Sequence, residues 1–138
     1  MRKKSGIKPY IIGIILFKFS IITIASCDVS NDLIHLSPHG TYTFPSATVG
    51  YDAQTPLIVT VSTLDFSRFS MRTSLSGSNA SAFHVVGGQL NLRAVTYQFT
   101  IEPITGLSIG IYTATVTVTV TTDNRRESKS FDVSFTVE

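Results

Sequence analysis

Hydrophobic and polar residues alternate along most of the chain beyond residue 41, and this alternation predicts β-strands. In the segment 110–122, small or apolar side chains alternate with five threonines, Thr113, Thr115, Thr117, Thr119 and Thr121. A period of two places one set of side chains in a core and the other set in water. The segments 57–62, 69–76, 95–102 and 131–138 alternate in the same way. We therefore expect strands with one buried and one solvated face.

Residues that favour turns separate the alternating segments. They are Gly77-Ser78-Asn79, Gly87-Gly88, Pro103 to Gly106 and Asp123-Asn124. Further short strands near 41–44 and at 83–86 bring the expected number to about seven, and no sustained helical period interrupts them. Short strands at this spacing predict an all-β sandwich or barrel.

The first 26 residues have the order of a secretory signal peptide. A basic start, Arg2 to Lys8, precedes an apolar run, Tyr10 to Ala25, that ends in small residues. The run is shorter than the about 20 apolar residues of a membrane span. Lys18 lies in its middle, where a membrane helix would lose about 2.5–3.5 kcal/mol, and a lysine there is also unusual in a signal peptide. A cleaved signal is the leading interpretation, and a retained N-terminal anchor is the alternative.

Charge divides the chain at the same point. Five of the eleven basic residues precede Cys27 and no acidic residue does, whereas six basic and nine acidic residues follow. The net charge of +2 therefore comes from the leader. A nucleic-acid partner is not expected, because it needs Lys and Arg clustered on the folded domain.

The leader ends in Ile24-Ala25-Ser26-Cys27, which resembles the lipobox of bacterial lipoproteins. Cys27 is the only cysteine, so its thiol is free to take a diacylglycerol as a thioether. The small residues before it would admit the signal peptidase. The resemblance implies a lipidated Cys27 with at least two acyl chains, which is enough for stable anchoring. A free or buried thiol is the alternative.

Leu107-Ser108-Ile109-Gly110-Ile111-Tyr112 is similar to the Leu-x-x-Gly-x-Tyr turn of immunoglobulin-like and fibronectin-like domains. In those domains the tyrosine hydroxyl bonds back to the chain just upstream, forming the tyrosine corner. The resemblance implies that Tyr112 opens the penultimate strand, that Gly110 permits the turn and that Leu107 closes the base of the core. The segments 43–51, 74–83, 105–118 and 130–137 resemble Ig-like repeats of bacterial cell-surface proteins. There is no Trp and no cysteine pair, so the disulfide pin of antibody domains is absent.

These features predict a signal peptide over 1–26, a tether over 27–40 and one domain over 41–138. The domain is expected to be an all-β, immunoglobulin-like antiparallel β-sandwich of about seven strands.

Few residues suggest chemistry. Asp32, His35 and His39 have a spacing that suits a metal site on a helix, but Pro38 interrupts any helix there, and a solvated linker is the preferred interpretation. His84 is expected at the surface. Asn79-Ala80-Ser81 fits the N-glycosylation pattern, which a lipidated bacterial chain would seldom use. We expect no metal and no cofactor.

Catalytic residues are not expected either. The sequence has no Gly-x-Ser-x-Gly elbow for a nucleophilic serine, and Gly87-Gly88 precedes no helix that would form a phosphate cradle. The threonine row of 110–122 admits two interpretations. It is either a consequence of β propensity or a flat array that binds a regular surface. If that strand lay at a sheet edge, it would also be a template for an added strand.

The sequence thus predicts a lipid-anchored, extracytoplasmic Ig-like module that binds or spaces at the cell envelope and is not an enzyme. It would be held at the periplasmic or cell-surface face of a membrane by the lipid on Cys27. Its partner would be an envelope protein or polysaccharide. The alternatives are an orphan structural surface repeat without a ligand and a small envelope enzyme.

Overall fold

The computed structural model describes residues 32–63, 69–91 and 96–138. The chain divides into two units, Met1–Ser30 and Asn31–Glu138, and the described residues all belong to the second. The described residues form eight strands and one short 3₁₀ turn, η1. They are β1 (Ile34–Ser37), β2 (Thr41–Thr43), β3 (Leu57–Thr63), β4 (Phe69–Ser76), η1 (Ala80–Ala82), β5 (Phe83–Asn91), β6 (Thr96–Pro103), β7 (Gly110–Thr122) and β8 (Arg126–Val137). None of the described segments is a helix long and apolar enough to cross a membrane.

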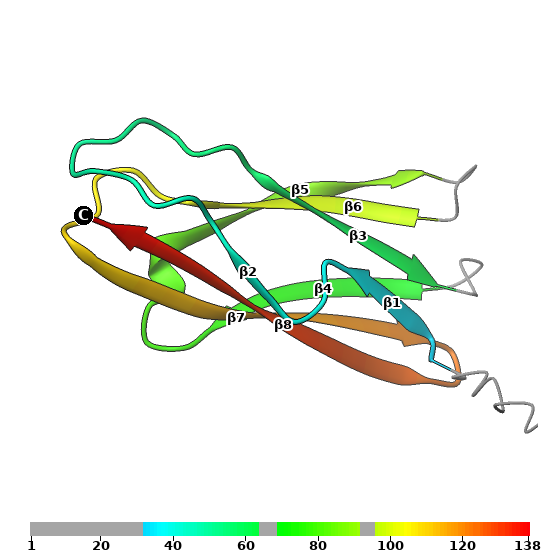
Figure 1. Cartoon of the computed structure of the whole chain (residues 1–138). Coiled ribbons are helices and arrows are strands. Elements are labelled where there is room, and N and C mark those ends of the chain that lie inside the picture. Colours follow the sequence, from blue (N-terminus) through cyan, green and yellow to red (C-terminus); the bar gives the residue numbers. More distant parts are fainter. Residues whose placement is uncertain (1–31, 64–68, 92–95) are drawn as a thin grey trace, which may run out of the picture. The chain divides into compact units, whose positions relative to one another are not determined.

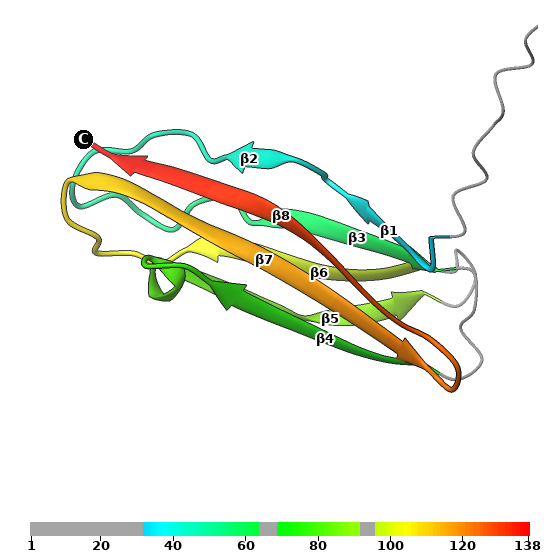
Figure 2. The same ribbon diagram turned by 90° about the horizontal axis from the view of Figure 1, so that it is seen from below.

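The strands form two sheets that face each other (Figure 1). One sheet has the order β1-β3-β6-β5, and the other has the order β2-β8-β7-β4. In Figure 2 the strands β8, β7 and β4 of the second sheet lie in front of the first sheet. All neighbours are antiparallel except β2 and β8, which are parallel. In Ig constant-type domains, strands A, B, E and D form one sheet, and strands C, F and G form the other.

Strand order assigns each strand to a place in this scheme. β1, β3, β6 and β5 take the places of A, B, E and D, and β4, β7 and β8 take those of C, F and G. β2 adds a short strand beside β8. The prediction of an all-β, Ig-like sandwich is confirmed, with eight strands instead of about seven.

The core lies between the sheets and follows the alternation of the sequence. Val116, Val118 and Val120 of β7 are all 0 % exposed, and Val59 and Val61 of β3 face them from the other sheet with the same value. Fully burying a side chain of this size stabilises the fold by about 1.5–3 kcal/mol. The core therefore depends on the inward-facing residues of two central strands, with phenylalanines filling the space around them.

The domain begins earlier than the sequence pattern suggests. β1 lies within the segment 27–40 that we expected to be a tether, and it pairs antiparallel with β3. Leu33 and Ile34 belong to the core, with Ile34 0 % exposed. Gly40, with a φ of +81°, lies where the chain passes from one sheet to the other. The boundary at residue 40 was therefore too late, because Pro38 and Gly40 mark a crossing between sheets and not a linker.

Gly87-Gly88 is also not a turn. β5 continues through both glycines to Asn91, and its register with β6 shifts between Val86 and Gln89. This shift is a β-bulge, in which one extra residue enters one strand of the pair. The backbone N–H of Gly88 donates a hydrogen bond to the hydroxyl of Tyr97 at 3.1 Å. A Cβ at Gly88 would overlap the Tyr97 ring and the carbonyl oxygen of Gln98.

Gly88→Ala should lower the free energy of unfolding by about 1–3 kcal/mol, because the added methyl group forces the two strands apart. Gly87→Ala is the matched control, since a Cβ at Gly87 meets no atom within 4 Å. Urea unfolding followed by circular dichroism measures both variants. Equal midpoints for the two variants would show that the bulge does not require glycine at position 88.

Candidate functional site

The predicted lipidation site, Cys27, lies outside the described residues, as do the predicted lipobox residues Ile24, Ala25 and Ser26 and the predicted signal peptide. The tyrosine-corner residues are described. The hydroxyl of Tyr112 donates a hydrogen bond to the carbonyl oxygen of Ser108, four residues upstream, at 2.8 Å. Gly110 opens β7 with a nearly extended backbone, and Leu107 packs against the core. This is the geometry of a tyrosine corner.

A second tyrosine holds the same connection from the other side. The hydroxyl of Tyr51 donates a hydrogen bond to the carbonyl oxygen of Ile104, and its ring packs edge-on against Phe135 with 5.2 Å between centroids. Burial raises the pKa of Tyr51, a backbone hydrogen bond with Leu107 acts in the opposite direction, and Tyr112 raises the pKa slightly further. Two tyrosines thus fix the β6–β7 connection. The sequence pattern pointed only to Tyr112, because Tyr51 lies in an irregular segment.

The hypothetical metal ligands are not assembled into a site. Asp32 forms an ion pair with Lys129, and the imidazoles of His35 and His39 are exposed. Across the described ranges, no group of three or more His, Cys, Asp or Glu side chains is placed to hold a metal ion. His84 is exposed and lies opposite Glu102 on the outer side of the first sheet.

The outer side of the second sheet carries a grid of hydroxyl groups, which we call the hydroxyl face. It consists of the outward side chains of four strands: Thr41 and Thr43 of β2; Ser70, Arg72, Ser74 and Ser76 of β4; Thr113, Thr115, Thr117, Thr119 and Thr121 of β7; and Arg126, Ser128, Ser130, Asp132 and Ser134 of β8. Strand register aligns these side chains in rows across the sheet. Thirteen of the sixteen are serine or threonine, so the face offers many groups that both donate and accept hydrogen bonds.

Hydrogen bonds connect the rows between β7 and β8. Thr115 Oγ1 donates to Asp132 Oδ1 at 2.7 Å. The hydroxyls of Thr117 and Ser130 lie 2.8 Å apart, and those of Thr119 and Ser128 lie 2.7 Å apart. Cross-strand pairs of this kind each contribute roughly 0.2–1 kcal/mol. They hold the outward side chains in a fixed arrangement.

The threonine row is therefore in the interior of a sheet. β7 lies between β4 and β8 and is not an edge strand. A partner strand therefore cannot be added to β7. The sequence pattern identified the threonines and a hairpin between 110–122 and 128–138, but it did not identify β4 as the neighbour on the other side. The sequence does show that the outward-facing positions of 69–76 and 126–134 in the alternating pattern are mostly serine.

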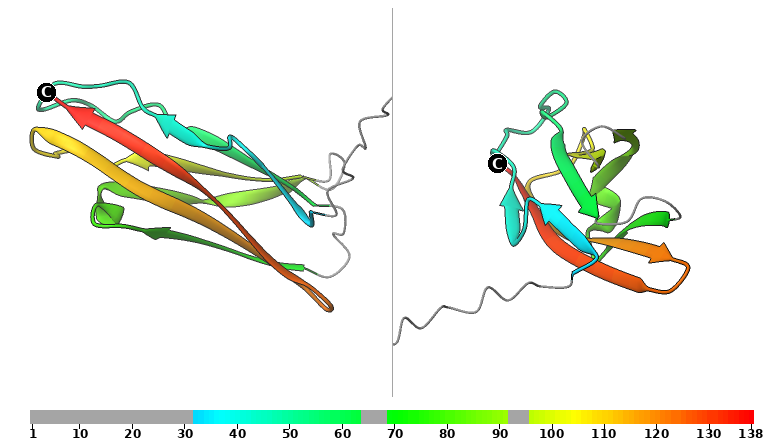
Figure 3. Two further views of the ribbon diagram at one scale, coloured as in Figure 1. Left: turned by 60° about the horizontal axis from the view of Figure 1, so that its bottom comes forward. Right: turned by 90° about the vertical axis from the view of Figure 1, so that its right-hand side faces the viewer.

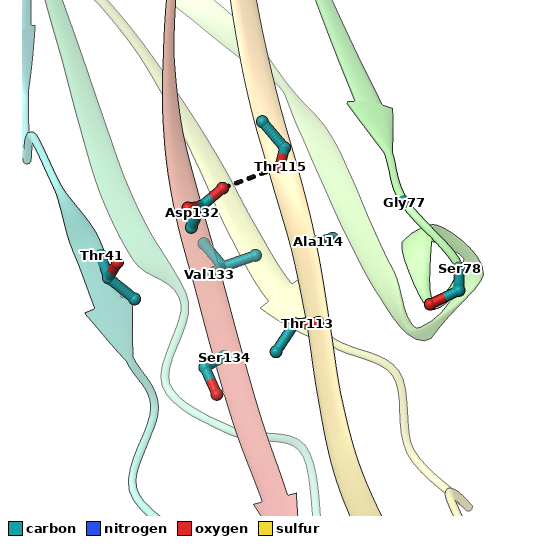
Figure 4. Close-up of a pocket in the computed structure, with 9 residues that line it drawn as sticks. All are labelled: Thr41, Gly77, Ser78, Thr113, Ala114, Thr115, Asp132, Val133 and Ser134. Atoms are coloured by element: carbon teal, nitrogen blue, oxygen red, sulfur yellow. Dashed lines mark hydrogen bonds between the residues drawn. The ribbon is translucent and has the colours of Figure 1, made fainter.

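A hollow of about 430 Å³ lies in one end of the hydroxyl face (Figure 4). It is lined by Thr41, Gly77, Ser78, Thr113, Ala114, Thr115, Asp132, Val133 and Ser134. Asp132 contributes a carboxylate to this lining, and Thr115 donates to that carboxylate. The backbone N–H of Asp132 is occupied by a hydrogen bond to the carbonyl oxygen of Gly40 at 2.9 Å. One carboxylate surrounded by hydroxyls on an open surface suits a ligand rich in hydrogen-bond donors.

No protein-family model matches the chain, and no curated protein matches it. Among solved structures, it is similar to the CooA pilin subunit from enterotoxigenic Escherichia coli, with a TM-score of 0.45 and 14% identity over 78% of this chain and 99% of that one. It is also similar to a family 123 glycoside hydrolase from Clostridium perfringens, with a TM-score of 0.42 and 15% identity over 72% of this chain. The match covers 23% of the hydrolase. The Ig-like assignment rests on strand order and register, and not on these likenesses.

The raised pKa of Tyr51 predicts a loss of stability at alkaline pH. Because the unfolded chain releases the phenol proton near pH 10 and the folded domain holds it longer, the contribution of Tyr51 is complete below about pH 10 and falls as pH rises through the folded pKa. Tyr51→Phe removes this titration. The free energy of unfolding, from urea titrations at pH 9 to 12, should fall less steeply for the variant.

Loss of the hydrogen bond to Ile104 lowers the free energy of unfolding of the variant at every pH. The quantity to compare is therefore the slope of the free energy of unfolding against pH. Parallel slopes for the two proteins would contradict the prediction.

Proposed function

We propose that the protein is a lipid-anchored, extracytoplasmic Ig-like module that binds a polysaccharide of the cell envelope through the hydroxyl face. The observation that carries this proposal is the hollow around Asp132, where one carboxylate lies among hydroxyls on a rigid sheet. A polysaccharide offers many hydroxyl donors along an extended chain. An open, flat face accommodates such a chain without enclosing it.

Binding without chemistry suits the same geometry. The residues that line the hollow belong to the central strand pair β7–β8, to β2 and to the turn after β4. Asp132 is the one titratable group in this lining. General acid–base or nucleophilic catalysis needs at least two groups with distinct roles within hydrogen-bond reach. A single carboxylate fits recognition better than catalysis.

The anchor completes the proposal. The leader and the resemblance of 24–27 to a lipobox support attachment through Cys27. Asp32, where the described residues begin, is the fifth residue after Cys27. Fully extended, five residues span at most about 18 Å. An anchored domain would therefore remain within reach of the envelope layers next to the membrane.

Expression of the gene in a bacterium with a palmitate analogue tests the anchor. The wild-type chain should incorporate the label and sediment with membranes, whereas Cys27→Ala should do neither, because the thioether cannot form without the thiol. Ser26→Ala is a suitable control, since it keeps a small residue before the cysteine. An unlabelled wild type would disprove lipid attachment.

Asp132→Asn tests the binding face. Hydrogen bonds to a charged group contribute about 1.5–3 kcal/mol, so the variant should bind purified envelope polysaccharide about 10- to 100-fold more weakly in a pelleting assay. Asp52→Asn is the matched control, because Asp52 is exposed and outside the hollow. If the wild type binds an envelope protein or nothing at all, the polysaccharide proposal is wrong, and the second outcome would favour a spacer.

A further inference from the structure

The end of the domain that receives the chain from Cys27 differs in charge from the opposite end. All four basic residues of the described ranges, Arg72, Arg125, Arg126 and Lys129, lie in the half that contains the β7–β8 hairpin. β1 begins at this end as well, as Figures 1 and 3 show. The carboxylates of Asp52, Glu102, Asp132 and Glu138 lie away from it. We call this the hairpin end.

Two of these basic residues have acidic partners at the hairpin end. Arg125 pairs with Glu127 at 3.2 Å, and Lys129 pairs with Asp32. Arg72 and Arg126 form no ion pair within the described residues. Their charges are therefore available to an external anion.

Arg72 and Arg126 flank a second hollow on the hydroxyl face. Arg72 of β4 lies opposite Thr119, and Arg126 of β8 lies opposite Thr121, so the two arginines stand on either side of β7. The hollow has a volume of about 380 Å³, and Ser70, Met71, Thr119 and Thr121 complete its lining. Two guanidinium groups with hydroxyls between them are donors that suit a phosphate group. Within this lining there is no carboxylate to compete.

We propose that the Arg72–Arg126 hollow binds the anionic headgroups of the membrane in which Cys27 is anchored. This inference rests on the proposed lipid anchor. Attachment of Cys27 brings the hairpin end to the membrane, because the five residues up to Asp32 span at most about 18 Å. Each arginine close to an anionic leaflet raises the equilibrium constant for membrane binding about five-fold. The two arginines together favour a docked domain by about 30-fold over a freely tumbling one.

Docking would orient the rest of the hydroxyl face. Asp132 lies six residues along β8 from Arg126, which is about 20 Å at the rise of a β-strand. The hollow around Asp132 would thus stand away from the headgroups while the arginines contact them. Its negative charge would also be repelled by an anionic surface, which favours the same orientation.

The experiment uses the full, lipidated protein in vesicles. The chain contains no tryptophan, so Asn124→Trp in the β7–β8 turn provides one fluorescent reporter at the hairpin end. Quenching by brominated lipid reports its proximity to the bilayer. Vesicles of phosphatidylcholine with a quarter phosphatidylglycerol are compared with vesicles of phosphatidylcholine alone. Strong quenching is expected only with the anionic lipid, and 0.5 M NaCl should reduce it.

Arg72→Gln with Arg126→Gln should lower the docked fraction in anionic vesicles to its level in phosphatidylcholine. Arg125→Gln is the matched control, because it removes a neighbouring charge outside the hollow and should retain most of the quenching. Every sample carries the same tryptophan, so the affinity of the tryptophan itself for the membrane surface does not affect the comparison between variants. Inorganic phosphate at matched ionic strength should compete for the hollow.

Flotation of the vesicles separates the two proposals. If the protein floats with both kinds of vesicle but the quenching does not depend on lipid charge or on the two arginines, the anchor proposal stands and the docking proposal is wrong. Protein that floats with neither would refute the anchor, and the docking proposal would fall with it.

Discussion

The pairing register of β7 is the constraint on which the rest of the structure depends. β7 is paired along twelve residues with β8 and along eight with β4. Because side chains alternate with a period of two, a slip of one residue would exchange the two faces of the strand. Val116, Val118 and Val120 would then meet water, and the threonines would enter the core. The buried valines fix the register, and the register in turn builds the hydroxyl face from residues of separate strands.

The sequence pattern predicted the parts of this structure that are local. Alternation located β3, β4, β6, β7 and β8 and the face that each one buries, and the tyrosine motif pointed to the β6–β7 connection. The pattern is weaker for β1, since four residues provide only two alternations and flanking Pro38 and Gly40 suggest irregular chain. A pair of glycines is compatible with either a turn or a bulge, and only the partner strand decides between them.

Most of the candidate site could not be predicted from the sequence. Thr115 and Asp132 are 17 residues apart and share a hydrogen bond, and Arg72 and Arg126 line one hollow from strands on either side of β7. The pair Thr115 and Asp132 depends on the register of the β7–β8 hairpin, and the pair Arg72 and Arg126 depends on strand order, which no local pattern determines. The predicted lipobox that ends at Cys27 is the reverse case, because its motif is visible in the sequence and lies outside the described residues.

The hairpin end shows how the entry of the chain is joined to the fold. Glu127 lies opposite Val120 and Lys129 opposite Val118, so alternation turns both charged side chains inward, beneath the start of β1. There Glu127 Oε2 accepts a hydrogen bond from the N–H of Leu33 at 2.9 Å, and Lys129 pairs with Asp32. Side chains of Asp32 and Lys129 remain partly exposed, so their attraction adds little stability. Their effect is positional: they fix the point where the chain enters the sandwich, next to the strand that carries Arg126. The start of the described chain at Asp32 and Leu33 is therefore held directly against β8, the strand that also carries part of the hydroxyl face.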